Sequence, residues 1–119
     1  MTEIIHKKID AITAEQYARA FRALGDRMPS DLLEAHLAAP NYTTTWQDLA
    51  EAVGMTSYRG VNARYGNFAR EVAELLGVEK PEGWVLVLVR WAKERGSRGH
   101  TAFVLRKPVI EALTTHRSI

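Results

Sequence analysis

Residues 43–77 read TTTWQDLAEAVGMTSYRGVNARYGNFAREVAELLG, and this stretch decides the fold because it encodes two helices separated by a tight turn. The first helix is expected to begin at Thr44 or Thr45, with a capping-box partner three residues further on. Gly54 marks the turn, since a left-handed backbone there is costly for any residue that carries a Cβ. We therefore predict a helix-turn-helix over residues 44–76.

Apolar residues in this stretch recur at helical spacing. The expected buried positions of the first helix are Trp46, Leu49, Ala50 and Val53. The second helix should be capped by Ser57 and ended by Gly77. Its core stripe, spaced by four, three, four and three, consists of Val61, Tyr65, Phe68, Val72 and Leu75. Ala50 must be small because the second helix crosses close to it, so the two helices should pack tightly.

The outward face of the second helix carries an unusual mixture of polar and very small residues. A step of about 100° per residue from Val61 places five residues opposite the core. They are Arg59, Asn62, Ala63, Gly66 and Arg70, with Asn67 at the border and Arg64 flanking the buried side. Arg matches guanine and Asn matches adenine bidentately in the major groove. Gly66 weakens the helix by roughly 1 kcal/mol relative to Ala, which either close packing or close approach to base edges would compensate.

Residues 84–106 predict a β-hairpin. The run Trp84–Trp91, rich in β-branched and aromatic residues, is typical of a strand buried on both faces, and residues 100–106 alternate in polarity. The polar loop between them is basic. Lys93, Arg95, Arg98 and His100 lie at or beside the expected tip, with Arg90 and Arg106 at the base. Such a wing could place cations on phosphates or in a narrow minor groove, although loops are also basic for solubility alone.

The flanking segments complete a mainly helical chain. Residues 3–9 suggest a short edge strand, and Thr13 with Gln16 forms a capping box for a helix that ends at Gly25. Ser30 can cap a further helix that stops before Pro40. Pro108 suits the first residue of a closing helix through about Thr115. We predict one α+β domain over residues 1–119, a winged helix-turn-helix-like fold with a C-terminal β-hairpin, residues 84–106, and a closing helix.

Charge is distributed unevenly along the 119 residues, whose net charge is only +2. Residues 1–56 carry five basic and eight acidic side chains, a net of −3, whereas residues 57–107 carry ten basic and five acidic side chains, a net of +5. This asymmetry indicates one face that meets a polyanion, unless it is an accidental polarity of a solvated surface.

The composition also excludes several classes of protein. The absence of cysteine excludes disulfides, thiolate zinc sites and cysteine nucleophiles. No metal-ligand spacing or phosphate-binding glycine loop occurs, so we expect no enzyme, no catalytic residue, no metal and no cofactor. The longest apolar run, Val85–Val89, is too short to span a bilayer. We expect a soluble cytoplasmic protein without a membrane partner.

The spacing Trp46-x-x-Leu49-Ala50-x-x-Val53-Gly54-x-x-x-Tyr58-x-x-x-Asn62-x-x-Tyr65-Gly66 resembles a DNA-recognition module fused to bacterial HNH and restriction-type endonucleases. The resemblance implies DNA recognition in restriction or phage defence, without the nuclease part, because the four histidines form no His-Asn-His cluster. Residues 44–61 are more loosely similar to the winged-helix half of O6-alkylguanine alkyltransferases and alkyltransferase-like proteins. The Pro-Cys/Trp-His-Arg segment of that family is absent, so only its DNA-docking half is implied.

These observations predict a non-enzymatic protein that binds double-stranded DNA, in restriction, phage defence or transcription control. The second helix would enter the major groove and the basic wing would contact the backbone. The expected DNA contacts are Tyr58, Arg59, Asn62, Arg64, Asn67, Arg70, Lys93, Arg95 and Arg98. Tyr58 would either stack on a base or cover the core. The alternative is a small phage or host interaction module, an inhibitor or adaptor that binds a nuclease or another protein through the same basic face.

Overall fold

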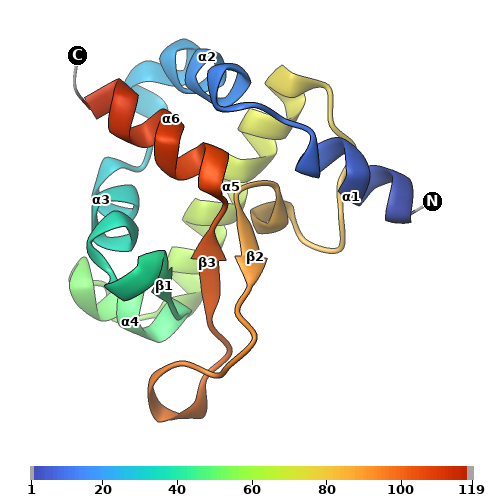
Figure 1. The fold of residues 1–119 in the computed structure, drawn as a ribbon. Coiled ribbons are helices and arrows are strands. Elements are labelled where there is room, and N and C mark those ends of the chain that lie inside the picture. The colour runs from blue at the N-terminus through green and yellow to red at the C-terminus, as the bar shows by residue number, and fades with distance from the viewer. Residues whose placement is uncertain (1, 118–119) are drawn as a thin grey trace.

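The computed structural model describes the backbone of residues 2–117, arranged as six α-helices and three short strands within that range (Figure 1). In chain order these are α1 (Thr2–Asp10), α2 (Ala14–Leu24), α3 (Ser30–Ala38), β1 (Thr43–Thr44), α4 (Trp46–Ala52), α5 (Tyr58–Leu76), β2 (Val89–Trp91), β3 (Phe103–Leu105) and α6 (Lys107–Arg117). The fold is α+β, as the sequence predicts.

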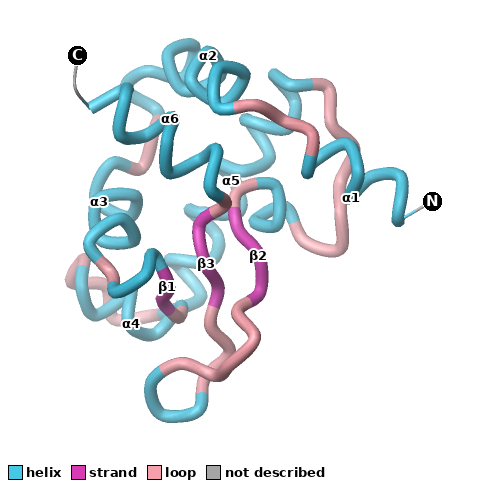
Figure 2. The backbone as a smooth tube through the Cα atoms, in the orientation of Figure 1, coloured by secondary structure: helices cyan, strands magenta, loops and turns pink. Residues whose placement is uncertain are grey.

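The three strands form one antiparallel sheet with the order β1-β3-β2. β2 and β3 pair as the predicted hairpin, with Trp91 opposite Phe103, and both strands continue into the loop that joins them (Figure 2). β1 pairs with the other edge of β3, placing Thr44 opposite Phe103. The sequence did not indicate β1, because two threonines before a helix are also typical of a helix entry.

The core lies around α5. This helix contacts α4, α2 and a 3₁₀ helix at Trp84–Val87, while α2 packs against α6. The buried residues form one contiguous cluster. Its largest fully buried side chains include Tyr65 of α5, Phe103 of β3, and Tyr17 and Phe21 of α2. Four of the five predicted core positions of α5 are buried. The prediction for Leu75 is wrong, because this side chain is 50% exposed.

The predicted edge strand over residues 3–9 is wrong, since this segment belongs to α1. Ile5 and Ile9 are four residues apart, so a helix places both on the side that packs against the core. Ile9 is buried and Ile5 is partly buried. The helix also brings His6 Nε2 to 2.7 Å from Glu82 Oε1. Packing of one helical face therefore outweighs the β preference of the isoleucines.

The predicted continuous strand Trp84–Trp91 is also wrong in its first half, which forms the 3₁₀ helix. All side chains from Val85 to Val89 are buried, so the apolar run satisfies burial against α5 rather than a sheet. Periodicity cannot separate these two cases. The segment is held by Tyr17, whose hydroxyl donates to the Val87 carbonyl oxygen at 2.6 Å.

Predicted helix ends are mostly confirmed. Thr13 and Gln16 form a reciprocal capping box at the start of α2, and Gly25 follows its end. α3 stops before Pro40, but Ser30 is its first residue and makes no cap, because Pro29 occupies the N-cap position. α6 begins one residue before Pro108. Across the part of the chain that the structure describes, no helix has both the length and the apolar character needed to cross a membrane.

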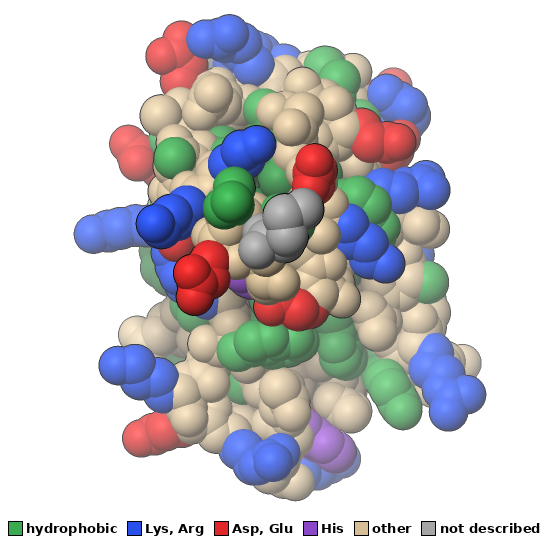
Figure 3. All heavy atoms as spheres, turned by 90° about the vertical axis from the view of Figure 1, so that its right-hand side faces the viewer, with side chains coloured by type: hydrophobic (Ala, Val, Ile, Leu, Met, Phe, Trp, Pro, Cys, Tyr) green, Lys and Arg blue, Asp and Glu red, His purple; other side chains and the backbone are tan. Residues whose placement is uncertain are grey.

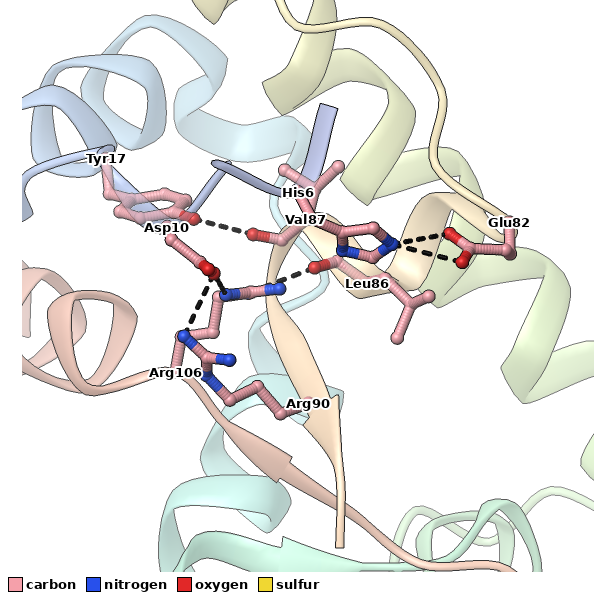
Figure 4. Close-up of polar contacts among 8 residues, drawn as sticks. All are labelled: His6, Asp10, Tyr17, Glu82, Leu86, Val87, Arg90 and Arg106. Carbon is pink, nitrogen blue, oxygen red and sulfur yellow. Dashed lines mark hydrogen bonds and ion pairs between the residues drawn. The ribbon is translucent and has the colours of Figure 1, made fainter. Parts of the chain in front are cut away.

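A charged cluster joins the N-terminal segment to the base of the hairpin (Figure 4). Arg106 is 5% exposed; its Nε donates to the Leu86 carbonyl at 3.0 Å and its Nη1 to Asp10 Oδ1 at 2.8 Å. Arg90 Nη2 donates to the same carboxylate oxygen at 2.9 Å. Burial alone would raise the pKa of Asp10, but the hydrogen bond from Arg106 and the charge of Arg90 hold it below its usual value. Both arginines at the base of the hairpin are thus part of the scaffold.

Candidate nucleic-acid interface

α4 and α5 are two consecutive helices joined by a short turn, at the place where the sequence predicts the helix-turn-helix. Of the two candidate caps it is Thr45 that starts α4, because its hydroxyl accepts from the Asp48 N–H at 3.0 Å. The turn closes where the Met55 N–H donates to the Ala50 carbonyl at 2.8 Å, with Gly54 at φ +73°. The left-handed Gly54 predicted from the sequence is therefore confirmed.

The start of α5 is fixed against this turn. The Ser57 hydroxyl accepts from the Arg59 N–H at 3.2 Å, which confirms the predicted cap. A Cβ added at Gly60 would lie 2.8 Å from Met55 Cε, so the first turn of α5 lies very close to the loop. Ala50 is 6% exposed beneath the crossing, as expected for a small residue there.

The outward face of α5 consists of side chains without partners. Arg59, Asn62 and Arg70 are exposed, as is Asn67 beside them. Among the described residues, none of these four side chains makes a hydrogen bond or an ion pair within the protein. Tyr58 is 43% exposed at the first position of α5, so its ring does not close the core. This face is fully available to a partner.

Gly66 lies next to this face and has no packing reason to be glycine. A Cβ added there would meet no atom of the described residues within 4 Å. A Gly in a helix interior destabilises the helix by roughly 1 kcal/mol relative to Ala, and no contact of the described residues at this position offsets that loss. Close packing against another element of the described residues therefore does not explain Gly66.

Arg64 differs from the other cations of α5. Its Nη1 and Nη2 donate to Asp31 Oδ2 and Oδ1 at 3.0 and 2.7 Å, joining α5 to α3. The hydrogen bond from Arg64 is the main reason why the pKa of Asp31 is lowered. A bidentate pair of this kind holds the guanidinium in place. Arg64 is thus engaged within the protein, and its partner, 33 residues away, gave no signal in the sequence.

The hairpin loop is docked onto α4 rather than projecting freely. The Ser97 hydroxyl donates to the Asp48 carboxylate, 2.8 Å from Oδ2 and 3.0 Å from Oδ1. A Cβ added at Gly96 would lie only 2.6 Å from Thr45 Cγ2, so the loop backbone lies directly against the cap of α4. No local sequence pattern indicates this contact, because it joins residues 49 positions apart.

The basic side chains of the loop lie at the surface. Lys93, Arg95 and Arg98 are exposed, and Arg95 Nη1 donates to the Gly99 carbonyl at 3.1 Å. Arg98 occupies the left-handed region with φ +56° at the tip of the loop. Figure 3 shows Lys and Arg side chains projecting from the lower end of the molecule, the end that the hairpin loop forms in Figure 1.

A buried polar pair braces the core behind the interface. His36 Nδ1 lies 2.7 Å from the Tyr65 hydroxyl, joining α3 to α5, and His36 has no exposed surface. Burial lowers the pKa of His36 to about 4, against smaller opposing effects of the backbone at Phe103 and Tyr42. The imidazole is therefore neutral at neutral pH, as a group without a counter-charge must be in such a site.

Comparison with known proteins supplies no relative. No family model matches the sequence, and no curated protein and no solved structure matches it significantly. Within the described residues, no group of three or more His, Cys, Asp or Glu side chains is placed to hold a metal ion. The features of the molecule that bear on its function are therefore the geometry of the α5 face and that of the hairpin loop.

Proposed function

We propose that the protein is a non-enzymatic, duplex DNA-binding protein of the winged helix-turn-helix type. A strand, a helix-turn-helix and a two-stranded hairpin follow one another, and the strand pairs with the hairpin. In this arrangement the second helix of the pair enters the major groove and the hairpin acts as the wing. The observation that carries the proposal is the outward face of α5, which combines unpartnered Arg and Asn side chains with an unexplained glycine at position 66.

Sequence-specific contacts with the bases would be made by the first turns of α5. Residues 57–70 contain three arginines and no acidic residue, so nothing on this half of the helix repels a phosphate. Arg59 and Asn62 are exposed near the helix start, where a recognition helix presents its base-contacting side chains. Their side chains match guanine and adenine edges respectively. Gly66 lets the helix axis approach the groove closely.

Contacts with the DNA phosphates would be made by the loop of the β2–β3 hairpin. Lys93, Arg95 and Arg98 supply cations of the kind that bind phosphate oxygens without reading sequence. The hydrogen bond between the Ser97 hydroxyl and the Asp48 carboxylate attaches the loop that carries these cations to α4. Arg64 is left out of the proposed contact set, since its guanidinium is already held by Asp31.

Salt dependence of binding tests the proposal. If four to six phosphates are neutralised, the logarithm of affinity for a random-sequence duplex should fall against the logarithm of salt with a slope of roughly −4 to −5. Fluorescence anisotropy between about 50 and 200 mM salt measures this slope. Absence of binding at the lowest salt would refute the proposal, and an acidic protein surface would then be the partner to seek.

A matched pair of double variants locates the contact. R95A/R98A should weaken binding to all fully paired duplexes alike and flatten the slope by roughly 2 units. R19A/R22A removes the same charge from the exposed side of α2 and should leave the slope almost unchanged. Equal losses in both variants would mean that net charge, rather than the hairpin loop, governs binding.

A further inference from the structure

A pocket of about 390 Å³ opens between the start of α4 and the hairpin loop. Trp46 and Gln47 line it from α4, and Trp91, Arg95 and His100 line it from the hairpin. Trp91 is 52% exposed, which makes it the most exposed Trp, Phe or Tyr among the described residues. A large ring left in water forgoes the burial that usually stabilises it, and here it lines a hollow, which makes this surface a candidate binding site.

The walls of the pocket are held in place. Both tryptophans contact the buried ring of Phe103, with ring centroids 4.3 Å apart for Trp46 and 6.4 Å apart for Trp91. The outer wall is held by the Gly96 N–H, which donates to the His100 carbonyl at 2.8 Å. Together with the docking of Ser97 on α4, these contacts give a preformed recess rather than a gap between mobile segments.

The chemistry of the lining selects a ligand class. Indole rings offer flat faces for stacking, and the Gln47 amide and the His100 imidazole offer hydrogen-bond donors and acceptors. Arg95 supplies a cation at the rim, and no acidic side chain of the described residues lines the recess. A cationic ligand would therefore be repelled by Arg95. The complementary ligand is planar, aromatic, able to form hydrogen bonds and anionic, which describes a nucleotide.

We propose that this pocket receives an unstacked nucleobase of a DNA strand, with the base on Trp91 and its phosphate on Arg95. The inference rests on the proposed function in one respect, since the strand is supplied by a duplex held by α5 and the loop. Aromatic side chains bind bases by stacking regardless of sequence. An unpaired base enters such a pocket most readily, because it gives up the least stacking and pairing.

Indole N–H signals in a ¹H–¹⁵N NMR spectrum test the pocket without a duplex. The chain has three tryptophans, and Trp84 lies outside the pocket as an internal control. Titration with deoxyadenosine monophosphate should shift the signals of Trp46 and Trp91 and leave that of Trp84 in place. Shifts at none of the three, or equal shifts at all three, would overturn the proposal.

A second measurement tests whether the base comes from a DNA strand. Unmodified protein should bind a duplex with a single-nucleotide bulge roughly tenfold more tightly than the fully paired duplex. Trp91→Leu should abolish this preference while leaving affinity for the paired duplex unchanged, and Trp91→Phe should restore most of it. Leu75→Ala, which removes an exposed apolar side chain at the far end of α5, should keep the full preference.

The outcomes separate this inference from the proposed function. Salt-dependent binding of the paired duplex without any preference for the bulge would overturn the base pocket and leave duplex binding intact. The nucleotide could instead shift the Trp46 and Trp91 signals while the protein binds bulged and paired duplexes equally. The occupant of the pocket would then be a free nucleotide and not a base of a DNA strand. The same shifts in a protein that binds no duplex would refute the proposed function and the strand-borne base together.

Discussion

The two ends of the β2–β3 hairpin both carry basic side chains, but only one end provides them with a counter-charge. At the base, Arg90 and Arg106 share the carboxylate of Asp10. In the loop, Lys93 and Arg98 have no partner among the described residues. A cation paired within the fold has its charge neutralised by the protein itself, whereas the charge of an unpaired cation can be neutralised by another molecule. The basic residues that stabilise the fold therefore differ from those of the proposed interface in being paired with a carboxylate, not in the sign of their charge.

The same contrast divides α5. Arg64 is held by Asp31 on the side that faces α3, whereas Arg59 and Arg70 are unpaired on the outward face. All three arginines lie within four turns of one helix, so the sequence alone does not separate them. The separation depends on what lies opposite each side chain in the folded protein.

Lowering the pH should reduce the stability of the fold without removing the positive charge of the proposed interface, because arginine stays protonated at every pH considered. His36 has a pKa of about 4 in the fold and about 6.5 when unfolded, so the unfolded state binds the proton first. The contribution of His36 to the free energy of unfolding should therefore be fully present above about pH 7. It should be lost, by about 3 kcal/mol in all, as the pH drops through 4. Urea denaturation across this range measures the loss.

His36→Gln serves as the control for this prediction, since it cannot titrate and should flatten the pH dependence between about pH 4 and 7. The lowered pKa of Asp10 adds a separate loss as that carboxylate becomes protonated at lower pH. Unchanged pH dependence in the variant would mean that His36 does not dominate the acid response.

Removing the buried arginine at the hairpin base should affect folding alone. Arg106→Met leaves the Leu86 carbonyl without its donor and Asp10 with a single partner, which should cost about 2–3 kcal/mol of unfolding free energy. Arg90→Met removes a mostly exposed partner of the same carboxylate and should cost less than about 1 kcal/mol. Thermal and urea denaturation measure both losses. Similar losses in the two variants would contradict the distinction.

Removing unpaired side chains from α5 should reduce DNA binding and leave the stability of the fold almost unchanged. Arg59→Ala or Asn62→Ala should cost roughly 2 kcal/mol of binding free energy on the preferred DNA site, with far less change on random DNA. Stability should stay within about 0.5 kcal/mol, as for most exposed substitutions. Titrations against both DNAs, paired with melting curves, check the two parts. A large drop in melting temperature for Asn62→Ala would make Asn62 a structural residue.

The two glycines inside α5 allow the smallest and sharpest comparison. Gly66→Ala should raise stability by up to about 1 kcal/mol, because a Cβ there meets open space, and should weaken DNA binding by crowding the groove. Gly60→Ala should give a smaller gain, since its Cβ would have to displace Met55 Cε, the flexible end of that side chain. Urea denaturation and DNA titration of both variants test this pair. Tighter DNA binding by the Gly66 variant would remove Gly66 from the interface.

The helices α4 and α5 and the turn between them could be predicted because their signals are local. Caps at Thr45 and Ser57, the left-handed Gly54 and Gly77, and the stripe beginning at Val61 each depend on neighbours within a few residues. Local signals of this kind agree with the fold when secondary structure is determined by capping and amphipathicity. The exposed face of α5 follows from the same periodicity.

Other features depend on contacts that no local pattern contains. Asp10 and Arg106 are 96 positions apart, and the two residues of β1 form a strand only because β3 lies beside them. The N-terminal segment became a helix because Ile9 has a core to enter. In each case the tertiary partner decides the outcome, and the sequence does not show where that partner lies.

The docked loop also affects the kinetics of association. A mobile loop loses its freedom when it meets a partner, at a cost of about 0.5–1.5 kcal/mol for each side chain that is immobilised. Here the contact of Ser97 with Asp48, and that of Gly96 with Thr45, order the loop backbone during folding. Encounter with a partner then needs no rearrangement of the loop, so association should be fast. Differences in affinity among DNA sequences should appear mainly as differences in the lifetime of the complex.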